Sequence, residues 1–267
     1  MTLDLGNHLW LGTMAWAFDT WVGNFYPPKT KSGDYLPAYA LQFPSVEIDS
    51  TFYAIPRESV VQGWAAKTPD DFLFCPKFPQ LITHEKRLHY ADLETEAFLA
   101  TMRLLGAKLG PLVLQFDYTF QADQLPSLTA YLDSLPKDLR YAVEVRHRSW
   151  LKEDLYQTLA ARNVALVMSD LYYMPRKPVR TANFAYIRLL GDRRQIPRDM
   201  GEIVQDRTGD LVFWRDQILT LRDEGYDVFA FANNKYEGHA PTTVRRLAGL
   251  LDEGVTPHEE VEHVAHQ

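Results

Sequence analysis

The sequence has little cysteine, no excess of basic residues and no long apolar run, and each shortage excludes a class of protein. Its single cysteine, Cys75, cannot form an internal disulfide or a cysteine-rich zinc site, so a disulfide-stabilised secreted scaffold is excluded. No apolar stretch approaches the roughly 18 residues that span a bilayer. Met1–Asn7 has neither a basic segment nor a signal-type apolar core. We therefore expect a cytoplasmic protein without a membrane partner.

The charge balance is mildly acidic. Lysine and arginine number 28 against 35 aspartates and glutamates, which gives a formal net charge of −7. A protein that coats duplex nucleic acid by releasing counterions from phosphates needs an excess of basic residues, so nucleic acid is a partner to consider but not the favoured one. Part of the negative charge lies in residues 255–267, which contain three glutamates and no basic residue. We expect this acidic, histidine-containing tail to be disordered.

Residues 1–254 alternate between short apolar runs and longer segments with helical spacing. The short runs predict eight strands: Leu9–Ala15, Ser45–Thr51, Phe72–Phe78, Leu112–Phe116, Arg140–Arg146, Val164–Asp170, Phe184–Gly191 and Asp227–Asn234. The longer segments predict helices over Ser59–Ala66, Asp92–Lys108, Leu125–Leu132, Lys152–Arg162, Leu211–Glu224 and Thr242–Asp252. Pro175 and Pro178 leave little room for a helix after the sixth strand.

Strands that alternate with helices predict an α/β protein whose strands are parallel, because parallel strands need a crossover connection. Eight such units in about 250 residues are typical of a (β/α)₈ TIM-like barrel. We therefore expect residues 1–254 to form one barrel domain, with one weak or missing helix after strand six. The alternative is an open, doubly wound sheet with a similar number of strands.

Polar side chains recur near the carboxyl ends of these strands, where the loops of a barrel converge on its active site. Parallel strands are buried on both faces, so polar residues inside them are unusual. The alternation in residues 46–51 places Glu47 and Asp49 on the inner face. The same reasoning selects Lys77, Gln115, Glu144, Arg146, Asp170, Arg188, Asn233 and Asn234. Because buried charges must be paired, a purely structural ion pair between Glu47 and an arginine is the alternative interpretation.

Aromatic and histidine side chains follow several of the strands. These aromatic side chains either pack their loops onto the barrel or form a stacking wall for a base or sugar; they include Trp16, Tyr53, Tyr118, Trp150, Tyr172 and Tyr173. His147 and His239 follow the fifth and eighth strands. His84, in the loop beyond Lys77, either lies at the surface or reaches the mouth of the barrel.

Several sequence strings, in order between about Trp10 and Leu251, resemble the YecE-like family, also called domain of unknown function 72. They are Trp21–Pro27, Val46–Tyr53, Lys77–Pro79 with Ile82–His84, Val143–His147 with Ser149–Trp150, Tyr186–Arg188, and Phe231–Asn234 with Gly238–Ala240. The resemblance implies a (β/α)₈ barrel but no reaction. The chain departs from the family pattern at Asp49, where relatives commonly have Asn, and at Asp117-Tyr118, where they have a proline-rich step. It also has Leu190 in place of a histidine, so any catalytic role of that histidine does not carry over.

The first functional hypothesis is a polar pocket that binds a small anionic ligand, phosphorylated or carboxylated, for acid/base or hydrolytic chemistry. The catalytic candidates are Asp49, Lys77 and Glu144, since a carboxylate in a dry pocket can transfer a proton and a lysine can hold an anion or form a Schiff base. The substrate-binding candidates are Glu47, Gln115, Arg146, His147, Asp170, Arg188, Asn233, Asn234, His239, Trp16, Tyr53 and Trp150.

Two further hypotheses come from other classes. A metal-dependent phosphodiesterase or nuclease-like enzyme would hold Mg or Mn with ligands drawn from Asp49, Glu144, Asp170 and His239, with Glu47 and His147 also in the pool. The sequence itself requires no cofactor. A non-catalytic module would instead recognise a metabolite or a nucleic-acid end. The loop cations that could follow a nucleic-acid backbone are Arg57, Lys86, Arg87, Arg193, Arg194 and Arg198.

Overall fold

The computed structural model describes residue 6 and residues 8–253, and its strands are all parallel. The strands are β1 (Leu9–Thr13), β2 (Ser45–Ile48), β3 (Leu73–Pro76), β4 (Leu112–Gln115), β5 (Tyr141–Glu144), β6 (Ala165–Leu166), β7 (Met168–Leu171), β8 (Phe184–Gly191) and β9 (Asp227–Ala232). They form a six-stranded sheet in the order β3-β2-β1-β9-β8-β7 and a three-stranded sheet in the order β4-β5-β6. All eight predicted strands are present, and the predicted α/β class is confirmed.

The sixth predicted strand is divided between the two sheets. β6 pairs with β5 and β7 pairs with β8, with only Val167 between them. The Val167 amide donates to the Val143 carbonyl at 2.9 Å. At the other junction, isolated bridges join Phe74 to Leu109 and Lys77 to Val113. The sheets therefore meet at two places without forming one continuous ladder.

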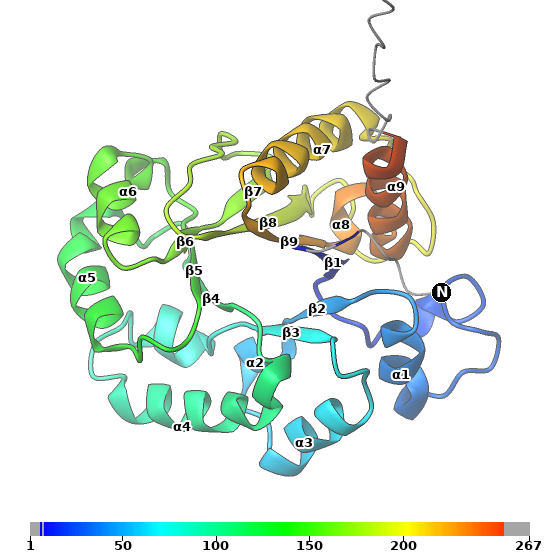
Figure 1. The fold of residues 1–267 in the computed structure, drawn as a ribbon, viewed down its shortest axis with the longest axis horizontal. Helices are drawn as coiled ribbons and strands as arrows, with labels where there is room; N and C mark the ends of the chain where they lie inside the picture. The colour runs from blue at the N-terminus through cyan, green and yellow to red at the C-terminus, as the bar shows by residue number, and fades with distance from the viewer. Residues whose placement is uncertain (1–5, 7, 254–267) are drawn as a thin grey trace, which may run out of the picture.

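Helices surround the strands (Figure 1). The six predicted helices correspond to α3 (Glu58–Ala66), α4 (Asp92–Met102), α5 (Leu125–Ser134), α6 (Glu153–Ala160), α7 (Thr208–Asp223) and α9 (Ala240–Glu253). α4 ends earlier than predicted, because Arg103–Lys108 forms a 3₁₀ turn in which Gly106 leaves the helical conformation. Three short helices were not predicted: α1 (Tyr35–Ala40), α2 (Ser50–Tyr53) and α8 (Asn234–Glu237).

The expected gap in the helical layer is present. Residues 172–183, which follow β7, contain no helix, as Pro175 and Pro178 predict. Within the part of the chain that the structure describes, no helix has the length and apolarity needed to cross a membrane. The tail predicted at residues 255–267 lies outside the described residues.

The apolar core has an outer and an inner part. The outer cluster packs the helices onto the strands, whereas a smaller cluster contains Val113, Ala142 and Tyr186. Gln115, Glu144 and Arg188 lie two residues further along the same strands. Because side chains of a strand alternate between its faces, they lie on the same face as the inner cluster. The inner cluster thus ends in polar side chains at the carboxyl ends of the strands.

Candidate anion-binding site

A sealed ion network lies beneath the carboxyl ends of the strands. Arg188 on β8 is 1% exposed, and its Nη2 lies 2.7 Å from Oε1 of Glu47, which is fully buried. Its Nη1 donates to Oε2 of Glu144, which is also fully buried. The Tyr186 hydroxyl donates to Oε2 of Glu47 at 2.9 Å. The predicted ion pair between Glu47 and an arginine is therefore present, and it includes a second carboxylate.

The charges of this network set its pKa values. Burial raises the pKa of Glu144, but the positive charges of Arg188 and Arg146 lower it further, to about 2. Burial also raises the pKa of Glu47, and the charge of Arg188 offsets only part of that effect. Glu144 is thus a permanent anion rather than a group that exchanges a proton near neutral pH.

Two other predicted catalytic residues pair with each other beside this network. Lys77 Nζ lies 2.8 Å from Asp49 Oδ1 and 4.4 Å from the centre of the Phe52 ring. Asp49 Oδ1 also lies 4.0 Å from Arg188 Nη2. Asp49, Lys77 and Glu144 thus lie in one region of the structure, and each is paired with an opposite charge.

The expectation that Asp170 points into the barrel is wrong. Its carboxylate accepts from Trp214 Nε1 at 2.9 Å and Tyr236 Oη at 2.7 Å, and it lies 3.0 Å from Arg176 Nη2. Trp214 belongs to α7, so Asp170 faces the helical layer. The break at Val167 and the register shift at residues 170–171 change which side chains of this strand face inward.

Several other predicted site residues either pack against other protein groups or are exposed to solvent. Trp150 is buried and donates to the Phe120 carbonyl, and Trp16 packs edge-on against Trp64. The side-chain oxygen of Asn234 accepts from the Ala240 amide, and His239 packs edge-on against the indole of Trp21. Tyr53 on α2 is 73% exposed.

The donors predicted for a metal are not brought together. Asp170 faces α7, and His239 lies against Trp21 with its Nδ1 2.7 Å from Thr242 Oγ1. Among the described residues, no three histidine, cysteine, aspartate or glutamate side chains are arranged to hold an ion. The proposed ligand set therefore does not fit a Mg or Mn site.

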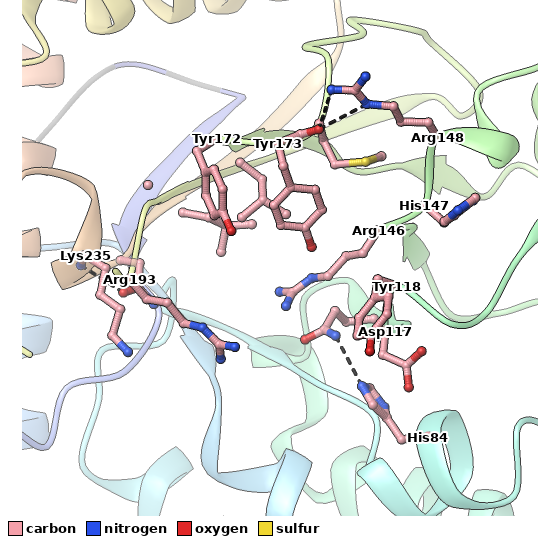
Figure 2. Close-up of a pocket in the computed structure, with 16 residues that line it drawn as sticks. His84, Asp117, Tyr118, Arg146, His147, Arg148, Tyr172, Tyr173, Arg193 and Lys235 are labelled. Carbon is pink, nitrogen blue, oxygen red and sulfur yellow. Dashed lines mark hydrogen bonds between the residues drawn. The ribbon is translucent and has the colours of Figure 1, made fainter. Parts of the chain in front are cut away.

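A cavity of about 890 Å³ opens at the carboxyl ends of β4, β5, β7, β8 and β9 (Figure 2). Gln115, Arg146, His147 and Asn233 are the predicted site residues that line it. The other lining residues are His84, Asp117, Tyr118, Arg148, Leu171, Tyr172, Tyr173, Met174, Leu190, Gly191, Arg193 and Lys235. The cavity thus has four fixed cations, Arg146, Arg148, Arg193 and Lys235, and one carboxylate, Asp117.

Two of these cations have no anionic partner among the described residues. Within residues 8–253, the side chains of Arg193 and Lys235 make no hydrogen bond or ion pair, and Figure 2 shows both directed into the cavity. Gly191 allows this arrangement. Its φ is +70°, and a Cβ there would lie 2.2 Å from the Lys235 carbonyl oxygen. Only glycine permits the end of β8 to approach α8 so closely.

Arg146 belongs both to the cavity and to the ion network. Its Nε donates to Oε1 of Glu144 at 2.6 Å, while its two terminal nitrogens have no hydrogen-bond partner among the described residues. Figure 2 shows the guanidinium projecting into the cavity. Glu144 therefore fixes Arg146 from behind and leaves its paired N–H donors available to a ligand.

His84 is a titratable residue of the cavity wall. Its Nδ1 lies 2.8 Å from Thr83 Oγ1, its Nε2 faces the Gln115 side-chain amide nitrogen at 3.5 Å, and its ring packs edge-on against Phe52. Burial is the main cause that lowers the pKa of His84 below 6.5, against the opposing charge of Asp117. The ring is therefore neutral at pH 7 and can accept a proton.

Sequence reasoning missed the full composition of this wall. Lys235 was not among the predicted site residues; it follows the strand-end asparagine Asn234 and is the second residue of the four-residue helix α8. Arg193 was predicted only as a loop cation for a nucleic-acid backbone, and His84 had two interpretations. The local signal was Gly191, since a glycine at a strand end often marks a close backbone approach.

The fold and this cavity define a class of α/β proteins with parallel strands and a polar pocket at their carboxyl ends. The family model for the protein of unknown function DUF72 matches residues 10–264, and the chain belongs to this family. The predicted resemblance is thereby confirmed.

Two groups of relatives illustrate the match. UPF0759 protein YecE of Escherichia coli strain K12 is 38% identical over 167 residues, which cover 61% of this chain and 59% of that protein, so the match spans about three fifths of the length of the relative. UPF0759 protein YunF of Bacillus subtilis is 29% identical over 257 residues, covering 86% of this chain and 90% of that protein.

Solved structures extend the likeness to the fold. A DUF72 family protein from Thermotoga maritima superimposes with a TM-score of 0.79 at 26% identity, over 91% of this chain and 99% of that one. A second, from Enterococcus faecalis, has a TM-score of 0.72 at 22% identity, over 91% and 95% of the two chains.

Proposed function

We propose that this protein binds a small anionic ligand, phosphorylated or carboxylated, in the cavity and carries out acid/base chemistry on it. The observation that carries the proposal is that two cations lining one cavity, Arg193 and Lys235, have no carboxylate partner in the described part of the chain. Both positive charges attract an anion that enters the cavity. The arrangement is therefore suited to a ligand that brings its own negative charge.

Arg146, Arg193 and Lys235 have complementary roles in this proposal. Arg146 presents two parallel N–H donors, which match the oxygens of a phosphate or carboxylate. Lys235 supplies a point charge, and Arg193 adds a second guanidinium beside it. Gln115 and Asn233 line the same cavity and orient the uncharged part of the ligand.

Proton transfer falls to His84 in this proposal. A general base must be unprotonated at the working pH, and burial lowers the pKa of His84, which keeps this cavity-lining ring neutral at pH 7. The carboxylates first favoured for this role are held in ion pairs. Glu144 acts as a positioning residue for Arg146, and the Asp49–Lys77 pair supports the same end of the network.

We also propose that the two sheets complete a (β/α)₈ barrel. Counting β6 and β7 as one strand gives eight, and this strand connects β5 to β8. The bridges between residues 74 and 109 and between 77 and 113 close the other junction. The carboxyl ends of all eight strands would then surround one mouth, where the cavity opens.

Isothermal titration with orthophosphate, phosphorylated metabolites and carboxylated metabolites tests the anion site. The wild-type protein should bind at least one of these compounds, and the double variant Arg193→Gln/Lys235→Gln should bind it more than tenfold more weakly. The matched control is Arg198→Gln, an exposed cation on the same loop that does not line the cavity, and it should retain wild-type affinity. Equal affinity in all three proteins contradicts the proposal, as does the absence of anion binding.

The acid/base part has its own test. Prolonged incubation of the bound ligand, followed by NMR, should show conversion with the wild type and none with His84→Gln, which should still bind the ligand within about threefold of the wild type. Binding without conversion in the wild type would leave the site as a non-catalytic module and refute the chemical step.

A further inference from the structure

The wall of the cavity contains an aromatic plate, which is the ring of Tyr172 with the guanidinium of Arg194 stacked on it. The guanidinium carbon of Arg194 lies 4.0 Å from the centre of the Tyr172 ring. Arg194 is itself held by Asp192, which accepts from its Nε at 3.1 Å and its Nη2 at 2.9 Å. Asp192 is buried, so the carboxylate, the guanidinium and the phenol form an ordered stack.

A second tyrosine supports the first. Tyr173 meets Tyr172 edge-on, with ring centres 4.9 Å apart and an interplanar angle of 80°. Arg148 donates from its Nε and Nη2 to the Tyr173 carbonyl and fixes the backbone at this point. Figure 2 shows both phenol hydroxyls reaching into the cavity. These contacts restrain Tyr172 and Tyr173 in the absence of a ligand, and such restraint lowers the entropic cost of binding.

Tyr172 keeps a free surface despite these contacts. It is 46% exposed and lines the cavity, while Arg194 covers one of its faces. The neighbouring lining residues Leu171, Met174 and Leu190 are apolar. A partly exposed aromatic ring next to an apolar wall is the kind of surface against which planar rings pack in binding sites.

The cavity is also larger than a phosphate or a small carboxylate requires. Its volume of about 890 Å³ lies within the range of pockets that enclose a drug-sized molecule, roughly 300–1,000 Å³. Tyr172 and Arg193 come from neighbouring strands. Tyr172 follows β7, and Arg193 follows β8, which pairs with β7. The aromatic plate and the cation pair therefore belong to neighbouring walls of one cavity.

We infer that the ligand is a phosphomonoester of a planar ring compound, with its phosphate on Arg193 and Lys235 and its ring against Tyr172. The inference rests on the proposed anion site and names the class of molecule that fills it. The phosphate would meet the two cations that lack a partner in the described chain, and the ring would pack against the exposed part of Tyr172. His84, Gln115 and Asp117 then face the remaining polar part of the molecule.

Matched pairs of phosphates test this inference by titration calorimetry with the full chain. Adenosine 5′-monophosphate and uridine 5′-monophosphate are compared with ribose 5-phosphate, and riboflavin 5′-phosphate is compared with ribitol 5-phosphate. At least one ring-bearing compound should bind tenfold or more tightly than its ringless partner. Tyr172→Leu should reduce this preference to within twofold and leave the affinity for the ringless phosphate unchanged.

Two further variants separate stacking from general damage. Tyr53→Leu removes a more exposed tyrosine that does not line the cavity, and it should keep the full preference for the ring. Arg194→Gln leaves Tyr172 in place but removes the guanidinium behind it, and it should reduce the preference by about threefold. A melting temperature within 2 °C of the wild type shows that each variant is folded.

The outcomes distinguish the two proposals. Equal binding of ring-bearing and ringless phosphates, or a preference that survives Tyr172→Leu in a folded protein, overturns the ring assignment and leaves the anion site intact. Failure of every phosphate to bind refutes both. Binding of adenosine as tight as that of its monophosphate refutes the anion site. Tighter binding of a short single-stranded oligonucleotide than of any mononucleotide overturns the small-molecule form of the inference.

Discussion

The two charged regions at the carboxyl ends of the strands use the same kinds of side chain in opposite ways. Arg188 is buried and lies between two buried carboxylates, Glu47 and Glu144. Arg193 and Lys235 lie at the wall of an open cavity and have no carboxylate partner in the described residues. A buried charge must be paired inside the protein, whereas a charge in contact with water can remain unpaired until a ligand arrives. Exposure, rather than residue type, therefore separates the structural charges from the binding charges.

Glu144 connects the two regions. One carboxylate oxygen accepts from Arg188 and the other from Arg146, which lines the cavity. The network thus positions one of the binding cations without itself meeting the ligand. Substitution of Arg188 should therefore change mainly the free energy of unfolding, whereas substitution of Arg146 should also change the affinity for the ligand.

The largest effect on stability is expected from Arg188→Met. This change leaves Glu47 and Glu144 buried without the cation between them, and removal of one partner from a buried ion pair costs about 3–5 kcal/mol. Urea denaturation should show this loss in the free energy of unfolding. Adding Glu47→Gln and Glu144→Gln should restore part of it, because the unpaired charges are then gone. A loss below about 1 kcal/mol, the value of an exposed pair, would show that the network is not sealed.

A smaller loss of stability is expected from Gly191→Ala, together with a loss of anion binding. The new methyl group meets the Lys235 carbonyl oxygen, and the positive φ is strained for alanine. The free energy of unfolding should fall by about 1–3 kcal/mol. Gly209→Ala, in α7 where a Cβ meets nothing, is the control and should not destabilise the protein. Unchanged phosphate affinity in Gly191→Ala would show that phosphate binding by Arg193 and Lys235 does not depend on this backbone contact.

Arg146→Gln should affect both regions moderately. Glu144 loses one of its two arginine partners but keeps Arg188, so a loss of about 1 kcal/mol in unfolding free energy is expected. The affinity for the anionic ligand should fall about tenfold, which corresponds to about 1.4 kcal/mol. Denaturation and calorimetry on the same preparation measure the two effects. Full affinity in this variant would place Arg146 in the structural region alone.

The smallest effect concerns pH. The folded pKa of His84 lies below 6.5, so the unfolded chain binds more protons as the solution is acidified. The stability contributed by neutral His84 is therefore complete above pH 6.5 and is lost as the pH falls through the folded pKa. His239, whose pKa burial also lowers, contributes with the same sign, whereas Glu47, whose pKa is raised, contributes with the opposite sign.

Melting temperatures of the wild type and His84→Gln, compared between about pH 8 and pH 5, isolate the contribution of His84. The difference between the two proteins should narrow as the pH falls below 6.5, because only the wild type loses stability by protonating this ring. A constant difference across the range would show that His84 is not held neutral.

Much of the fold followed from local sequence patterns. The alternation of strands and helices, and the inner-face positions of Glu47, Gln115, Glu144 and Arg188, depend on periods of 3.6 and 2 that neighbouring residues alone define. Asp170 is the exception, because the interruption at Val167 changes the alternation and no local pattern marked it. The short helix α8 was missed for a similar reason, since four residues are too few to show a helical period.

The sequence by itself determined that this is an α/β chain with polar groups near one end of its strands. Both properties follow from the spacing of residues that are close in the sequence. Only the tertiary structure decided which charges neutralise one another. Residues 47, 144 and 188 are far apart in the chain, and so are 193 and 235, so whether they meet depends on how distant segments pack. Pairing energies act through space over a few ångströms, which a linear pattern does not record.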